Sequence, residues 1–176
     1  MTSSSESLKQ YIRDVPDYPH KGIIFRDITP ILADKKIFPE VVDLMSKAWL
    51  DDKPDLVAAI EARGFIPGAA MAVKLNAGFV PIRKVGKLPW TVISESYQLE
   101  YGTDQLEVHS DAVEPGQKVL IVDDVLATGG TASAAVRLMR KLGAEVLGVQ
   151  VLIELSYLNG RERLSDVNLV SQIVYA

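Results

Sequence analysis

The sequence predicts an α/β fold in which a mostly parallel central sheet is flanked by helices. Short, continuous apolar runs at 56–60, 118–122 and 146–155 are typical of strands that are covered on both faces. Between them, apolar residues recur at helical spacing over about 36–50 and 131–142. Buried strands that alternate with helices favour a parallel sheet with helices on both faces. The length of 176 residues argues for a single domain, 1–176.

The N-terminal half of the chain alternates between helix and strand patterns. Ser5, Leu8, Tyr11 and Ile12 form a short amphipathic helical pattern that stops before Pro16, and a turn-rich segment follows. After the predicted 36–50 helix, the 56–60 strand leads through a polar loop into a helix that ends near Leu75. Asn76 and Gly78 terminate that helix. The expected elements are therefore a helix at 5–12, a helix at 36–50, a strand at 56–60, a helix up to 75 and a strand at 79–82.

Residues 83–109 interrupt this alternation. Basic residues gather at 83–87, and two short alternating runs at 90–94 and 105–108 flank residues 100–102. We interpret the segment as an exposed excursion that contains a hairpin. Long excursions of this kind often form lids or binding loops.

The C-terminal part returns to the strand and helix patterns. The 118–122 strand ends in two aspartates, and Gly143 ends the 131–142 helix. Two further strands are expected at 146–155 and 169–174. In parallel sheets, ligands bind beyond the carboxyl ends of the strands, so the rule points to the loops after Ile60, Ile82 and Val122.

Composition excludes several classes of site. The net charge of −4 disfavours a protein that neutralises many phosphates of duplex nucleic acid. Cysteine is absent, and His20 and His109 are far apart in the sequence, so thiolate chemistry and a histidine-rich zinc site are not expected. No stretch approaches the roughly 18 apolar residues that a membrane helix needs, and the first residues are polar. We therefore expect a cytoplasmic protein without membrane or nucleic-acid partners.

The segment 119–131, VLIVDDVLATGGT, carries the clearest chemical signal. Gly129 and Gly130 let backbone N–H groups approach a ligand closely, and the helix that follows adds N–H donors and a partial positive charge. Thr128 and Thr131 add hydroxyl donors. The segment therefore predicts a cradle for one phosphate group. The competing interpretation is an ordinary strand–turn–helix in which Gly-Gly makes the turn and threonine caps the helix.

The acidic pair narrows the ligand further. The segment has neither the Gly-Lys-Ser/Thr ending of a Walker A loop nor the spaced glycines of a dinucleotide loop. Asp123 and Asp124 precede the cradle, and their carboxylates can accept hydrogen bonds from two ribose hydroxyls. The ligand that this pattern indicates is a ribose 5-phosphate.

The 119–131 segment resembles the phosphoribosyl-pyrophosphate motif of the type I phosphoribosyltransferases. Further segments are similar to the adenine phosphoribosyltransferase family, and the likeness runs from about Leu8 to Tyr175. These segments are PHKGIIFRDITP at 19–30, EARGF at 61–65, IRKVGKLP at 82–89 and SYQLEYG at 96–102.

The resemblance implies a type I phosphoribosyltransferase fold with a hood at about 8–35 and a flexible catalytic loop at about 83–109. It also implies a purine salvage enzyme that converts adenine and phosphoribosyl pyrophosphate to AMP and pyrophosphate. Mg²⁺ is the expected cofactor, bound mainly through the pyrophosphate with no direct protein ligand. A homodimer is the expected assembly.

The resemblance also assigns roles to individual residues. Glu100 and Arg63 are the implied catalytic residues, with Glu100 handling the proton near N7 of adenine. A non-proline cis peptide is expected near Glu61–Ala62. The other implied contacts are Asp123, Asp124, Ala127, Thr128, Gly129, Gly130 and Thr131 for the ribose phosphate; Arg63, Arg83, Lys84, Lys87 and Tyr101 for the pyrophosphate; and Ile24, Phe25 and Arg26 for adenine.

Two alternatives remain open at this stage. Another purine or orotate phosphoribosyltransferase would share the ribose-phosphate cradle, so the cradle cannot discriminate between bases. A non-catalytic regulator could use the same fold to sense phosphoribosyl pyrophosphate, because a fold does not determine a function. Such a regulator is expected to carry a basic nucleic-acid surface, which the net charge disfavours.

Overall fold

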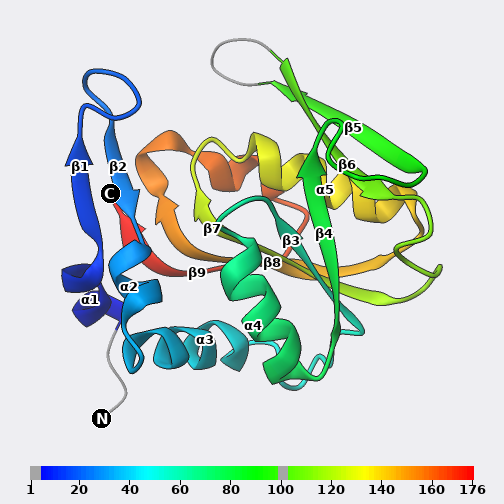
Figure 1. Ribbon diagram of the computed structural model, residues 1–176, viewed down its shortest axis with the longest axis horizontal. Coiled ribbons are helices and arrows are strands. Elements are labelled where there is room, and N and C mark those ends of the chain that lie inside the picture. The colour runs from blue at the N-terminus through cyan, green and yellow to red at the C-terminus, as the bar shows by residue number, and fades with distance from the viewer. Residues whose placement is uncertain (1–4, 99–102) are drawn as a thin grey trace.

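A computed structural model describes residues 5–98 and 103–176, and its main feature is one mixed sheet (Figure 1). Within the described residues the sheet has seven strands in the order β5-β6-β4-β3-β7-β8-β9. The pairs that join β4, β3, β7, β8 and β9 are parallel, whereas β5 and β6 are antiparallel additions at one edge. This confirms the predicted mostly parallel sheet. The strands are β3 (Leu56–Ile60), β4 (Gly78–Lys84), β5 (Val92–Gln98), β6 (Thr103–His109), β7 (Lys118–Leu126), β8 (Glu145–Leu155) and β9 (Leu169–Tyr175).

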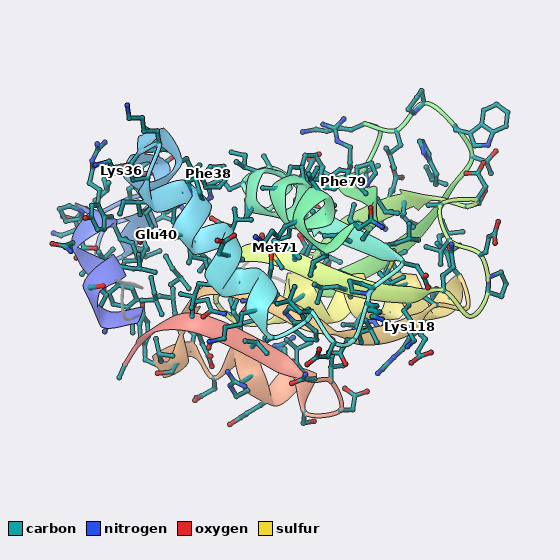
Figure 2. All side chains as sticks on the ribbon, turned by 90° about the horizontal axis from the view of Figure 1, so that it is seen from below. Lys36, Phe38, Glu40, Met71, Phe79 and Lys118 are labelled. Atoms are coloured by element: carbon teal, nitrogen blue, oxygen red, sulfur yellow. The ribbon has the colours of Figure 1, made fainter. Side chains whose placement is uncertain are left out.

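Helices cover both faces of the sheet, as the apolar runs of the strands require. Along β7, Leu120 and Val122 pack into the cluster under α3 and α4, whereas Val119 and Ile121 pack into the cluster under α5. Figure 2 shows α3 and α4 side by side on the same face. Because both faces are buried, the strand is apolar at successive positions. The three helices are α3 (Ile37–Lys47), α4 (Phe65–Leu75) and α5 (Gly130–Lys141).

The N-terminal region forms a small layer of its own beside the sheet. The predicted 5–12 helix is shorter than expected and ends in a 3-10 turn. Two strands that the sequence analysis did not predict pair with each other, so that Phe25 lies opposite Val15. Both strands have only four residues, which is too short for a clear alternation. The elements are α1 (Ser5–Leu8), η1 (Lys9–Tyr11), β1 (Arg13–Pro16), β2 (Ile24–Asp27) and α2 (Thr29–Ala33).

The interpretation of 83–109 as an exposed excursion is wrong in part. The hairpin exists, but β6 pairs with β4 and extends the sheet. Tyr97, Leu106 and Val108 are buried in the same cluster as the apolar face of α5. The apolar residues of the hairpin face α5, which explains why they alternate, while Glu107 on the opposite face accepts a hydrogen bond from the backbone N–H of Gly86. Residues 99–102 lie outside the described part of the chain.

The segment around the two aspartates also differs from the prediction. β7 continues to Leu126, so Asp123 and Asp124 belong to the strand, and Asp123 lies opposite Val151 of β8. After β8 come two 3-10 turns, η2 (Ser156–Leu158) and η3 (Gly160–Leu164), before β9. In the described residues, none of the helices combines the length and apolarity needed to cross a bilayer.

One buried polar contact links a helix to the sheet. The indole N–H of Trp49 donates to Oε1 of Gln150 at 2.8 Å, and both side chains are inaccessible to solvent. Trp49 follows α3, and Gln150 lies in the middle of β8. A buried carbonyl that loses its donor retains its desolvation penalty, so this contact should matter to stability.

Replacing Trp49 with phenylalanine should therefore destabilise the fold. The orphaned Gln150 carbonyl and the space that the indole leaves should together lower the free energy of unfolding by about 2–4 kcal/mol. Urea denaturation measures this change. The matched control is Trp90→Phe, because Trp90 is 66% exposed; its effect should stay within about 0.5 kcal/mol. Equal effects of the two substitutions would contradict the assignment.

Candidate functional site

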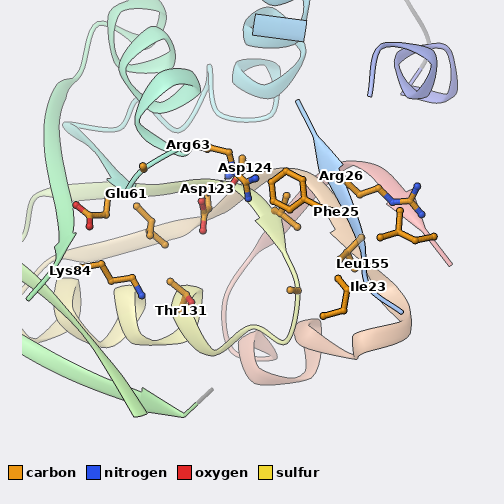
Figure 3. Close-up of a pocket in the computed structure, with 15 residues that line it drawn as sticks. Ile23, Phe25, Arg26, Glu61, Arg63, Lys84, Asp123, Asp124, Thr131 and Leu155 are labelled. Carbon is orange, nitrogen blue, oxygen red and sulfur yellow. Dashed lines mark hydrogen bonds and ion pairs between the residues drawn. The ribbon is translucent and has the colours of Figure 1, made fainter. Parts of the chain in front are cut away.

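The cavity that gathers most of the predicted site residues, called the main cavity below, opens at the carboxyl ends of β3 and β7, beside β2 (Figure 3). Its volume is about 430 Å³. The position agrees with the rule that ligands bind beyond the carboxyl ends of parallel strands. Its lining combines an apolar side from β2 with charged groups from the loops, and consists of Ile23, Ile24, Phe25, Arg26, Ile60, Glu61, Ala62, Arg63, Lys84, Asp123, Asp124, Val125, Ala127, Thr131 and Leu155.

Two adjacent carboxylates form the floor of this cavity. Asp124 is buried and Asp123 is partly buried, and the backbone N–H of Asp124 donates to Oδ1 of Asp123 at 2.8 Å. Burial and the neighbouring Asp124 carboxylate raise the pKa of Asp123 well above its usual value. Burial also raises the pKa of Asp124, although Arg63 opposes that effect. The pair is therefore suited to a ligand that supplies hydroxyl donors or positive charge.

Arg63 connects the acidic pair to the apolar side of the cavity. It follows β3, and its Nε lies 2.6 Å from Oδ2 of Asp124. Its guanidinium carbon also lies 4.5 Å from the centre of the Phe25 ring. The loop that carries Arg63 begins with a cis peptide between Glu61 and Ala62, as expected. The planar guanidinium in this place can bind two oxygens of a phosphate or carboxylate with two parallel hydrogen bonds.

The loop between β7 and α5 encloses a second, smaller cavity of about 70 Å³. Residues 123 and 125–132 line it, including every residue of the predicted phosphate cradle. Gly129 has a φ of 79° and stands immediately before α5. The first N–H groups of a helix have no partner within the helix, so they face an anion placed here.

The basic residues of β4 divide between two environments. Lys84 lines the main cavity, and its ammonium contacts Asp104 and the hydroxyl of Tyr97. Burial would lower the pKa of Lys84, but these partners raise it above its usual value, so the charge is retained.

Arg83 and Lys87 do not line the cavity; both contact Glu61, at 2.6 and 3.0 Å. Burial alone would raise the pKa of Glu61, but these two cations outweigh it and lower that pKa. Glu61 therefore holds two cationic side chains, Arg83 and Lys87, at the edge of the cavity.

The apolar side of the cavity comes from β2. The Phe25 ring is partly buried and contacts Tyr18 edge-on at 5.2 Å between ring centres. The guanidinium of Arg26 forms an ion pair with Asp14 and lies 3.9 Å from the centre of the Tyr175 ring. Ile24 is 44% exposed beside them. A flat aromatic ligand can therefore find a ring and aliphatic contacts here.

Metal ligands are sparse at this site. Across residues 5–98 and 103–176, no group of three or more His, Cys, Asp or Glu side chains could hold a metal ion. Mg²⁺ keeps several waters and takes oxygen ligands from substrate phosphates, so it binds through few protein groups. The site fits a magnesium ion that arrives with its substrate.

Comparison with known proteins shows the family. The model of the phosphoribosyl transferase domain matches residues 27–173. The adenine phosphoribosyltransferase of Thermotoga neapolitana is 62% identical over 96% of this chain and 99% of its own length. The chain belongs to the adenine phosphoribosyltransferase family.

Solved structures of this family agree with the fold. The adenine phosphoribosyltransferase of Thermoanaerobacter pseudethanolicus is 50% identical with a TM-score of 0.95, and the match covers 98% of this chain and all of that one. The Saccharomyces cerevisiae adenine phosphoribosyltransferase, solved with adenine and an imino-altritol bisphosphate, is 36% identical with a TM-score of 0.91 over 96% and 98% of the two chains. The predicted type I phosphoribosyltransferase fold is thereby confirmed.

Some predicted site residues of this adenine phosphoribosyltransferase family member lie outside the described residues, and some residues at the site were not predicted. Glu100 and Tyr101 fall outside the described residues. Two residues were not predicted from the sequence: Leu155, which lines the main cavity, and Gly160, which packs against the loop at 127–131, called the phosphate loop below after its predicted ligand. The dipeptide Asn159-Gly160 signals a turn, but its sequence gives no indication of what the turn contacts.

The raised pKa of Asp123 makes the site a source of instability. At a pH above the raised pKa, the ionised Asp123 carboxylate destabilises the folded state. This destabilisation is lost once the pH falls below the usual pKa of 3.8, because the carboxyl group is then protonated in both the folded and the unfolded state. Asp123→Asn should therefore raise the free energy of unfolding at pH 7, and the gain should shrink as the pH falls from the raised pKa toward the usual value. Chemical denaturation between pH 4 and 8 measures it.

Asp166→Asn is the matched control for this prediction. Asp166 is an exposed carboxylate that Arg140 contacts at 2.7 Å, and this hydrogen bond lowers its pKa. Its replacement should bring no gain in stability at pH 7. A loss of stability in Asp123→Asn at pH 7, or a gain that grows toward low pH, would contradict the account of the acidic pair.

Proposed function

We propose that this chain transfers phosphoribose from phosphoribosyl pyrophosphate to N9 of adenine, with AMP and pyrophosphate as products, in purine salvage. The observation that carries the proposal is that one cavity joins Phe25, Arg63 and the acidic pair, with the phosphate loop beside it. The curated relative at 62% identity bears the name adenine phosphoribosyltransferase, and the yeast relative was solved with adenine.

The sugar phosphate is proposed to occupy the loop and the acidic pair. Residues 127–131 donate N–H and hydroxyl groups to the 5-phosphate, and Asp123 and Asp124 accept from the ribose hydroxyls. As the bond to pyrophosphate breaks, the ribose carbon gains oxocarbenium character. The two nearby carboxylates stabilise that positive charge more than they stabilise the neutral sugar, which lowers the barrier.

The pyrophosphate leaving group is proposed to bind on the side of the acidic pair that faces away from the phosphate loop. Arg63 exchanges its ion pair with Asp124 for contacts with the pyrophosphate oxygens, and Lys84 adds a second cation at the cavity. Arg83, Lys87 and Tyr101 are the further pyrophosphate candidates; Lys87 would leave Glu61, and Arg83 would leave it or act in a neighbouring subunit. Mg²⁺, bound mainly by the pyrophosphate, supplies charge neutralisation there.

The base is proposed to lie against β2. Phe25 stacks on the purine, and the backbone of Ile24 and Arg26 reads its edge. Glu100, outside the described residues, is proposed to handle the proton at N7 while N9 attacks the ribose carbon. The hood at about 8–35 and the β5–β6 hairpin, which makes up most of the predicted catalytic loop at about 83–109, are proposed to flank these groups.

The assembly and location also remain proposals. α4 and β4 expose apolar side chains at Ile66, Val73 and Phe79, which supports a homodimer through this region. The phosphorylated substrate is highly charged and stays in the compartment that makes it, which supports a cytoplasmic location. The chain is not expected to bind nucleic acid or membranes.

An assay of the wild-type protein with phosphoribosyl pyrophosphate, Mg²⁺ and one base at a time tests the function. Adenine should yield AMP, and kcat/KM for guanine, hypoxanthine or orotate should be lower by at least about tenfold, because a site that hydrogen-bonds one base edge leaves polar groups unpaired with another. Faster use of guanine or hypoxanthine would replace the adenine assignment. Tight nucleic-acid binding without AMP formation would favour a regulator instead.

Arg63→Lys tests the assigned role of the guanidinium. Lysine keeps the charge but loses the planar pair of donors, so kcat/KM for phosphoribosyl pyrophosphate should fall by about 10–100-fold. Steady-state kinetics measure the fall. Arg140→Lys, at an exposed ion pair near the end of α5, is the matched control and should leave kcat/KM unchanged. Equal activity of the two variants would remove Arg63 from the reaction.

A further inference from the structure

The phosphate loop is in direct contact with a segment that the proposed chemistry does not use. Gly160, at the start of η3, is buried against the loop. A Cβ at Gly160 would lie 2.1 Å from the carbonyl oxygen of Ala127, and a Cβ at Gly129 would lie 2.3 Å from the carbonyl oxygen of Gly160. Two backbones therefore meet with no room for a side chain on either.

The next residue anchors this segment to the sheet. Arg161 donates from Nε and Nη2 to the two carboxylate oxygens of Glu154, at 2.9 and 2.6 Å. Its guanidinium also donates to the carbonyl of Leu169 at 3.1 Å and contacts Ser171, which itself donates to Glu154 at 2.6 Å. Glu154 lies near the end of β8 and Ser171 lies in β9, so one guanidinium joins η3 to two strands.

The anchor is unlike an ordinary surface ion pair. The Glu154 side chain is 6% exposed, and the hydrogen bonds from Arg161 lower its pKa despite its burial. A bidentate arginine–carboxylate pair with a buried acid fixes both position and orientation. Exposed ion pairs, in contrast, hold their partners loosely.

We propose that Arg161 is a positioning residue for the sugar-phosphate subsite, acting through the backbone of Gly160 on the loop at Ala127–Gly129. The inference rests on the proposed function, because it assumes that the loop binds the 5-phosphate. The loop N–H groups bind a phosphate well only where their directions converge on it, and Gly160 limits how far the loop can move away. Misplacement by about 1 Å can cost roughly 100-fold in rate.

Gly160→Ala is the direct test. The added methyl group must displace the carbonyl of Ala127, so KM for phosphoribosyl pyrophosphate should rise by about tenfold or more while KM for adenine stays within about twofold. Calorimetric titration with ribose 5-phosphate should show a matching loss of affinity. Titration with pyrophosphate should show none, because its proposed contacts lie beyond the acidic pair.

Arg161→Lys is the second variant, because it removes the bidentate contact without adding bulk. It should raise KM for phosphoribosyl pyrophosphate by a smaller factor, about three- to tenfold. Asp166→Asn is the matched control: it breaks the neighbouring pair between Arg140 and Asp166, which does not reach the phosphate loop. This control should leave both KM values unchanged.

The outcomes separate the possibilities. A selective loss of ribose 5-phosphate affinity in folded Gly160→Ala and Arg161→Lys supports the proposal. Wild-type affinity in both folded variants overturns it, and so does an equal loss for adenine and pyrophosphate, which marks a general structural role. If Gly160→Ala does not fold, Arg161→Lys decides by the same criteria. Failure of the wild type to form AMP removes the proposed function, whereas the ribose 5-phosphate titrations still test the positioning role.

Discussion

Arg63 and Asp124 form the ion pair around which the site is organised. Two adjacent carboxylates near the end of a buried strand lose hydration, which raises the pKa of each, and the Asp124 carboxylate raises the pKa of Asp123 further. One guanidinium, 2.6 Å from Asp124, compensates part of that penalty. A ligand with hydroxyl donors and a developing positive charge can compensate the rest. The free site therefore carries an electrostatic penalty from its buried carboxylates, and under the proposed function a bound sugar would relieve part of it.

The same guanidinium also occupies the base side of the cavity. Because Arg63 lies over the Phe25 ring, a purine that stacked on this face would displace the guanidinium, and a bound pyrophosphate would offer it a new partner. Under the proposed function, the base and leaving-group subsites are therefore coupled through one side chain. A similar exchange applies to Lys84, whose contacts with Asp104 and Tyr97 link the cavity to the β5–β6 hairpin.

The sequence predicted those parts of the molecule whose signal is local. The 56–60 strand, the α5 helix and the glycine-rich turn before it each have a continuous pattern that requires no partner to interpret. The contact between Gly160 and the loop could not be predicted, because it joins residues that are distant in sequence and depends on backbone proximity. The hairpin edge was misjudged for a related reason: its covering helix, α5, follows it in the chain. Likewise, nothing in the sequence indicates that Arg83 and Lys87 share Glu61.

A crystal structure of the protein with bound AMP tests the central claim most directly. The account predicts that the 5-phosphate lies in the loop at 127–131, with both ribose hydroxyls within hydrogen-bonding distance of Asp123 and Asp124 and with Arg63 moved from the Phe25 ring. A loop without the phosphate, and a nucleotide bound elsewhere on the molecule, would contradict it.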